Sequence, residues 1–135
     1  MGRIKKDKGK QGKNVTVQEP IDYNSKVPIF SLEKIQHGKY CLSSLDKDHK
    51  SMFADSIFKR KALTWKEITQ APKYGLGTEK IPKNSIKAPT PKFITEDLEE
   101  YLVFRYNGKA PMVGYRQRDV FFVLWFDHDF TLYKH

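Results

Sequence analysis

Apolar and polar residues alternate over residues 27–35, at the start of the apolar part of the chain. Phe30 and Leu32 alternate with the polar residues Ser31 and Glu33, so the two apolar side chains share one face of an extended segment. Pro28 lies near the beginning, where a strand tolerates proline. The pattern predicts a first strand, and the apolar residues 40–42 are expected to extend the sheet briefly.

Helical spacing replaces this alternation further along the chain. Asp46 precedes a periodic stretch and predicts a helix that it caps and that runs to about Lys61. Thr64 and Glu67 have the spacing of a capping box, so a second, short helix is expected to begin directly after Thr64. Pro72 ends that helix. The apolar stripe of the first helix comprises Leu45, Met52, Phe53, Ile57 and Phe58.

The last third of the chain has the strongest strand pattern. Residues 101–106 and 111–116 flank Asn107-Gly108, a dipeptide that suits a tight hairpin turn. Residues 120–126 are apolar on both faces, which is typical of a central strand that is covered on each side. Residues 130–133 alternate again, as a last strand would. A mainly antiparallel sheet with the helix pair on one face, an α+β fold, accommodates these elements.

Between the helices and the hairpin the pattern is weaker. Residues 79–81 predict a short strand, and the prolines of residues 82–97 predict an extended surface loop. Residues 1–25 are polar, rich in Lys and Gly and without periodicity, so we interpret them as a flexible basic arm. The chain has 135 residues, and the remainder, 26–135, has the size of a single domain.

Charge and composition narrow the class of protein. The net charge is +9, and residues 1–13 hold six Lys or Arg against one Asp. Excess positive charge favours contact with nucleic acid, because neutralised phosphates release counterions. A solubilising tail is the alternative. No apolar run approaches the roughly 20 residues of a membrane helix, and Cys41 is the only cysteine, so we expect a cytoplasmic protein without an internal disulfide.

Two arginines interrupt the apolar strands of the predicted hairpin, Arg105 on the first strand and Arg116 on the second. An arginine within a sheet needs a partner carboxylate, a ligand anion or access to the sheet edge. Two interpretations are open: a cleft in which both arginines bind phosphate, or ion pairs with nearby carboxylates. The carboxylates considered for such pairs are Glu99, Glu100 and Asp119.

Ionisable residues follow the most apolar strand. His128 lies between two aspartates, which can hold its tautomer and suit it for proton transfer, although a polar turn is the alternative. Tyr133 and His135 are further proton donors or acceptors, and Lys134 between them can hold a phosphate. Adjacent ligands on an extended segment point in alternating directions, so we expect no metal ion at residues 127–129 and no cofactor.

Six residues are candidates for nucleic-acid binding. Four of them belong to the predicted helix pair, whose outer side is expected to be basic, and a solvated surface is the alternative for these four. Tyr115 of the hairpin is a further candidate, because aromatic rings stack on bases. The candidates are Lys59, Arg60, Lys61, Lys66, Tyr115 and Lys134.

The order of these elements resembles that of a known family. A strand, two helices and an antiparallel meander with a His- and Tyr-bearing end are similar to the RelE/YoeB-like toxins of bacterial toxin–antitoxin pairs. Residues 102–106 and 113–116 look like the arginine-bearing strands of those toxins, and residues 120–133 look like the closing strand and its active end. The basic arm, the loop 82–97 and the Tyr-Lys-His order of the terminus depart from the family pattern.

The resemblance implies a RelE-like fold and a small basic ribonuclease that cleaves mRNA, commonly on the ribosome, with an antitoxin protein as partner. Cleavage without a metal ion needs a base for the 2′-hydroxyl, a cation for the charged phosphorane and an acid for the leaving oxygen. Arg105 and Arg116 suit the second task. His128, Tyr133 and His135 are the candidates for proton transfer. A nucleic-acid-binding module without turnover and a protein-interaction domain are the alternative functions.

Overall fold

The computed structural model describes residues 19–135. The strands are β1 (Ile29–Ser31), β2 (Thr78–Pro82), β3 (Glu100–Asn107), β4 (Ala110–Gln117) and β5 (Val120–Phe126), and the helices are α1 (Lys47–Lys59) and α2 (Trp65–Gln70). Three short 3-10 turns are η1 (Tyr23–Ser25), η2 (Leu42–Ser44) and η3 (Lys83–Ser85). Within the described part of the chain, no helix is long and apolar enough to cross a membrane.

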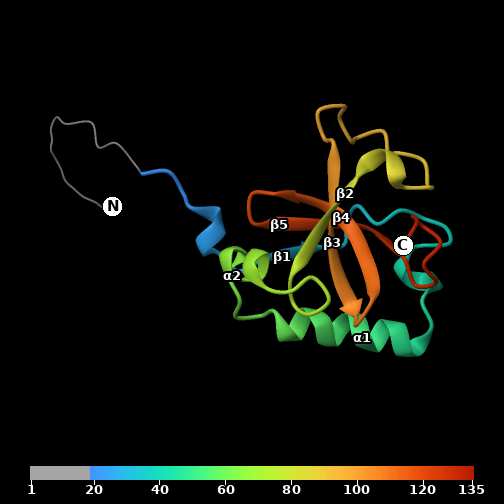
Figure 1. The fold of residues 1–135 in the computed structure, drawn as a ribbon, viewed down its shortest axis with the longest axis horizontal. Helices are drawn as coiled ribbons and strands as arrows, with labels where there is room; N and C mark the ends of the chain where they lie inside the picture. Colours follow the sequence, from blue (N-terminus) through green and yellow to red (C-terminus); the bar gives the residue numbers. More distant parts are fainter. Residues whose placement is uncertain (1–18) are drawn as a thin grey trace, which may run out of the picture.

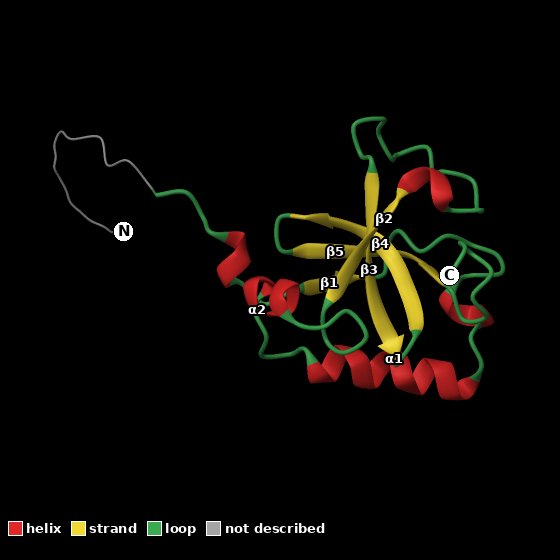
Figure 2. Ribbon diagram, viewed as in Figure 1, coloured by secondary structure: helices red, strands yellow, loops and turns green. Residues whose placement is uncertain are grey.

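The five strands form one sheet in the order β1-β5-β4-β3-β2 (Figure 1). Neighbouring strands are antiparallel, except that β1 and β5 run parallel. Figure 2 shows α1 running beneath the strands. The predicted α+β class and the mainly antiparallel sheet are therefore confirmed.

Both helices begin where their capping residues predicted. The Asp46 carboxylate accepts a hydrogen bond of 2.8 Å from the backbone N–H of His49. Thr64 and Glu67 form a complete capping box, in which each side chain accepts a hydrogen bond from the backbone N–H of the other residue. Local sequence signals are therefore sufficient to fix both helix starts.

The predicted hairpin is also present, as β3 and β4. Gly108 in its turn has a φ of +50°, a backbone conformation that glycine adopts without strain. The next strand, β5, was predicted to be central. It lies between β1 and β4 and is therefore inside the sheet, while β4 occupies the middle position of the five strands.

Buried apolar side chains form two groups. The first combines Phe53 of α1 and Trp65 of α2 with sheet residues that include Phe121 and Val123 of β5. The second includes Leu124 of β5 together with Leu132 and Tyr133 from the end of the chain. The loop between β2 and β3 adds partly buried side chains to this second group, namely Ile86, Ala88, Ile94 and Leu98. Strand β5 is therefore covered on both faces, as its apolar sequence predicted.

Two predicted strand segments adopt other structures. Residues 40–42 lead into η2 and do not extend the sheet. Residues 130–133 form bends, because the backbone N–H groups of Thr131 and Leu132 bond to the Asp127 carboxylate. Strand β1 is also shorter than the alternation predicted.

Most of the predicted basic arm lies outside the described residues, which begin at Glu19. The last part of the predicted arm contacts the domain through η1. Asn24 accepts a hydrogen bond of 2.7 Å from the Arg116 guanidinium, and the Lys26 carbonyl accepts one of 2.9 Å from the backbone N–H of Trp65. Residues 23–26 therefore contact both β4 and α2.

Candidate functional site

Asp127, directly after β5, organises the end of the chain. Its side chain is fully buried, and one carboxylate oxygen accepts hydrogen bonds of 2.8 Å and 3.0 Å from the backbone N–H groups of Thr131 and Leu132. The other oxygen lies 2.8 Å from Nε2 of His135. The carboxylate therefore holds the last residues in a turn and fixes the imidazole at the same time.

His135 and Tyr133 lie next to each other, with ring centroids 4.1 Å apart. The side chain of His135 is 27% exposed, whereas Tyr133 is buried. A carboxylate can only accept, so Nε2 of His135 donates to Asp127. Nδ1 is then the nitrogen left to exchange a proton with a ligand.

Arg105 reaches the same region from β3. Its side chain is buried, and Nη2 lies 2.7 Å from Oε1 of Glu79 on β2. Partial burial acts to raise the pKa of Glu79, but hydrogen bonds from Arg105 and Lys73 outweigh it and lower that pKa below its ordinary value. Nε and Nη1 of Arg105 have no hydrogen-bond partner among residues 19–135.

The Tyr133 hydroxyl is likewise buried without a partner in the described part of the chain. Burial raises its pKa to about 12, and the Arg105 cation nearby opposes that rise. Buried donors without partners are rare in native structures, and an ordered water molecule, a bound ion or a catalytic role accounts for them. We name Glu79, Arg105, Asp127, Tyr133 and His135 the C-terminal cluster. It presents three unpartnered donor groups that suit an anion.

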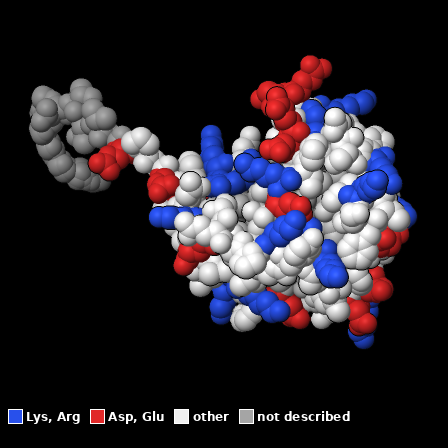
Figure 3. All heavy atoms as spheres, in the orientation of Figure 1, with Lys and Arg blue, Asp and Glu red and all other residues white. Residues whose placement is uncertain are grey.

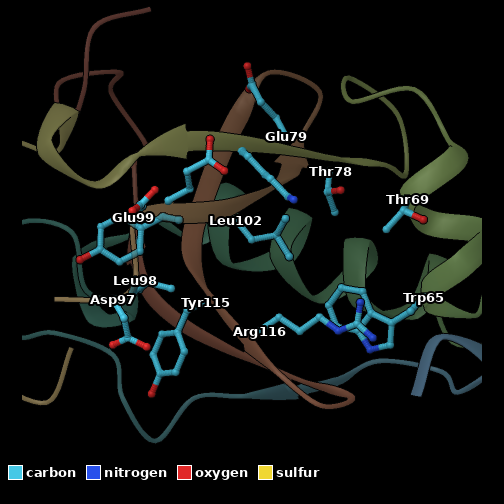
Figure 4. A pocket seen from close by; sticks show the side chains of 13 residues that line it. Trp65, Thr69, Thr78, Glu79, Asp97, Leu98, Glu99, Leu102, Tyr115 and Arg116 are labelled. Carbon is cyan, nitrogen blue, oxygen red and sulfur yellow. The ribbon is translucent and has the colours of Figure 1, made fainter. Parts of the chain in front are cut away.

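Arg116 is not part of this cluster. Its guanidinium lies 4.1 Å from the centre of the Trp65 ring and donates to Asn24 and to the Arg118 carbonyl. It lines a groove between α2 and the strands β2, β3 and β4, with a volume of about 650 Å³. Figure 4 shows its side chain beside Trp65. Arg105 and Arg116 therefore do not meet in one cleft, and the carboxylate that pairs with Arg105 is Glu79.

His128 lies in a separate group near the start of α1. Its Nε2 is 3.1 Å from the Lys39 carbonyl, and its ring centroid is 6.4 Å from that of His49. His49 in turn is 2.8 Å, through Nδ1, from the hydroxyl of Tyr106, whose pKa is raised mainly by burial. Of the three proton-transfer candidates, the structure thus brings together Tyr133 and His135 and places His128 elsewhere.

The candidates for nucleic-acid binding have different surroundings. Tyr115 is half-buried and stacks on Phe122, with ring centroids 5.0 Å apart. Figure 3 shows one group of acidic side chains at a tip of the visible face, and Lys and Arg interspersed with further acidic side chains over the rest of it. The exposed candidates are Lys59, Lys61, Lys66 and Lys134. The positive charge on the visible face is therefore scattered over several elements.

Arg60 does not lie on the outer side of the helix pair, where it was expected. It is 1% exposed and caps the end of α1. Its guanidinium donates hydrogen bonds of 3.1–3.2 Å to the backbone carbonyls of Ser56, Gly75, Leu76 and Arg105. Burial lowers its pKa to about 10, so it stays charged at neutral pH. Arg60 therefore joins α1, the loop before β2 and β3, and it is not free to bind nucleic acid.

Replacing Arg60 by Met should lower the free energy of unfolding by about 3 kcal/mol or more, because buried carbonyls that lose their donor cost about 1–3 kcal/mol each. Urea denaturation followed by circular dichroism measures this change. The control is Lys59→Met, an exposed neighbour whose replacement should change stability by less than about 0.5 kcal/mol. Equal stability of the two variants would contradict the assigned role.

Sequence reasoning missed three members of this region: Glu79, Asp127 as an anchor, and Tyr74. The sequence contained a signal for Glu79, because it is the single carboxylate of the predicted strand 79–81 and could have been considered as a partner for an arginine of the sheet. The ring of Tyr74 lies over the Arg105 guanidinium at 5.1 Å, a contact between distant segments for which the sequence holds no local signal.

Neither the search for metal sites nor the comparison with known proteins assigns a role to any further residue. Within residues 19–135, no group of three or more His, Cys, Asp and Glu side chains is placed to hold a metal ion. Comparisons of the chain with protein-family models, with curated proteins and with solved structures found no match. The geometry of the C-terminal cluster is therefore the main evidence for a function.

Proposed function

We propose that the protein is a metal-independent endoribonuclease and that the C-terminal cluster is its active site. The observation that carries this proposal is the buried Arg105. Two of its nitrogens, Nε and Nη1, have no partner among residues 19–135, and the guanidinium lies near the Tyr133 phenol and the His135–Asp127 pair. Arginine binds phosphate oxygens at two points, and the neighbouring groups supply proton donors and acceptors.

The chemistry can be written with every proton accounted for. Nδ1 of His135 takes the proton of the 2′-hydroxyl, and the 2′-oxygen attacks the phosphorus while Arg105 stabilises the phosphorane charge. The bond from phosphorus to the 5′-oxygen breaks, and Tyr133 gives that oxygen its proton. Exchange with water then restores the neutral imidazole and the phenol. The products are a 2′,3′-cyclic phosphate and a 5′-hydroxyl.

The raised pKa of Tyr133 agrees with the role of proton donor. Burial raises this pKa to about 12, so the phenol keeps its proton throughout the neutral range. A general acid has to be protonated before the reaction, and burial keeps this phenol protonated although the Arg105 cation nearby opposes the rise of its pKa. Activity should therefore show no loss from Tyr133 ionisation until the pH approaches 12.

The proposal extends to fold and partners through the RelE/YoeB resemblance. It includes a helix pair on one face of the sheet and a RelE-like topology. It also includes mRNA as the substrate, either free or bound to the ribosome, and an antitoxin as the protein partner. In support, side chains of both α1 and α2 belong to the same buried group. A non-catalytic RNA-binding module is the alternative, because Arg105 can hold a phosphate without any proton transfer.

Induction in bacterial cells tests the proposal. The wild-type chain should arrest growth and fragment mRNA, whereas Arg105→Gln should do neither. Arg116→Gln is the matched control, because Arg116 lies with Trp65 outside the C-terminal cluster, and it should stay toxic. A wild-type chain that leaves both growth and mRNA intact would rule out the ribonuclease and favour the binding module.

A further inference from the structure

A cavity of the structure shares Arg105 with the C-terminal cluster. Its volume is about 410 Å³, and it lies between the second half of α1, the loop before β2 and the β3–β4 turn. Volumes of about 300–1,000 Å³ are typical of small-ligand pockets. The residues that line it include Asp55, Lys59, Arg60, Tyr74, Arg105 and Asn107.

Tyr74 is the most exposed aromatic side chain of this cavity. Its side chain is 58% exposed, and its ring lies 5.1 Å from the Arg105 guanidinium carbon. Lys73 also lies over this ring, with Nζ 5.1 Å from its centroid. An exposed aromatic ring beside cationic side chains is a common arrangement for stacking a base of single-stranded nucleic acid.

The loop that carries Tyr74 is held in place. The Arg60 guanidinium bonds the carbonyls of Gly75 and Leu76, and the backbone N–H groups of Gly75 and Gly77 both bond the Pro72 carbonyl. A Cβ atom at Gly77 would lie 2.1 Å from the Ala71 carbonyl oxygen, so the tight turn requires glycine. These contacts hold the loop backbone in place and keep Tyr74 at the edge of the cavity.

We propose that this cavity binds a base of single-stranded RNA, stacked on Tyr74, while Arg105 holds the adjoining phosphate. The assignment rests on the proposed function, since it names a base subsite of the same active site. Asp55 and Asn107 line the cavity and offer hydrogen bonds to base edges, and Lys59 supplies positive charge for the backbone. The second observation that points to a ligand is Arg105, which is buried with two unpartnered donors.

Binding of a fluorescein-labelled 2′-O-methyl RNA oligonucleotide, measured by anisotropy, tests the inference, because this probe lacks the hydroxyl needed for cleavage. Tyr74→Ala should weaken binding by about tenfold or more, the loss typical of one stacked base. Tyr74→Phe should bind nearly as well as wild type, because it keeps the ring. Phe58→Ala is the control: Phe58 is a 65% exposed aromatic on α1 outside the cavity, and its loss should change affinity less than twofold.

The outcomes separate this inference from the proposed function. If wild type cleaves RNA while Tyr74→Ala binds the probe as tightly as wild type, the base subsite is wrong and the ribonuclease stands. If Tyr74→Ala weakens binding but wild type does not cleave RNA, the subsite stands and the ribonuclease fails. A wild-type chain that neither binds the probe nor cleaves RNA overturns both.

Discussion

Replacing His135 by Ala should lower the rate of RNA cleavage by about 100- to 10,000-fold, the range typical of a proton-transfer residue. His135 is bonded to the buried Asp127 and lies against Tyr133, so its ring is held where it can act on a bound phosphodiester. Single-turnover kinetics on a labelled RNA, with RNA binding measured in parallel, separate lost catalysis from lost affinity.

The matched control is His128→Ala. Both histidines follow β5 within the same short segment, but His128 lies with Lys39 and His49, away from the C-terminal cluster. It should retain cleavage within a few-fold of wild type. Comparable losses in both variants, or a loss confined to His128→Ala, would show that the C-terminal cluster is not the catalytic centre.

Replacing Val123 by Asp should prevent folding. Val123 is fully buried within the first group of apolar side chains, where a carboxylate finds neither water nor a partner cation. An isolated buried charge costs more than the total stability of about 5–15 kcal/mol that a domain usually has. Circular dichroism and thermal denaturation should show an unfolded chain.

Gln117→Asp places the same carboxylate on the neighbouring strand at an exposed position, and it should fold like wild type. A cooperative unfolding transition for Val123→Asp near that of the control would show that β5 is not buried in solution. Both variants introduce the same charged residue, so the difference between them reports on the burial of the introduced carboxylate.

Elements with local signals were predictable from the sequence. Asp46 and the Thr64/Glu67 pair begin helices because their side chains accept from backbone N–H groups a few residues away. The Asn107-Gly108 turn is local in the same sense. Such contacts are made within one element, and neighbouring residues decide them.

Contacts between distant segments were not predictable. Arg60 was expected to be exposed because arginine usually is, but it meets carbonyls of the loop before β2 and of β3. The segment 130–133 has the alternation of a strand, and it bends because the Asp127 carboxylate takes the N–H groups that a strand would use. Both outcomes depend on which groups the rest of the fold brings near.

The candidate site was predicted in part, and the missing part has a geometric reason. Arg105 pairs with Pro111 across the hairpin, so both side chains share one face of the sheet. Arg116 is five positions beyond Pro111 and therefore points to the opposite face, because successive side chains alternate. This orientation depends on the register shift between Arg105 and Asn107, which the hairpin pattern did not predict. The pairing of Arg105 with Glu79 required the position of β2.

End-group analysis of RNA cleaved by the purified chain in the presence of EDTA is the most direct test of metal-independent cleavage through the 2′-hydroxyl. The account predicts fragments that carry a 2′,3′-cyclic phosphate and a 5′-hydroxyl, and no cleavage of the same oligonucleotide made with 2′-O-methyl groups. Cleavage that stops in EDTA and returns with Mg²⁺, or fragments from the 2′-O-methyl oligonucleotide, would contradict it.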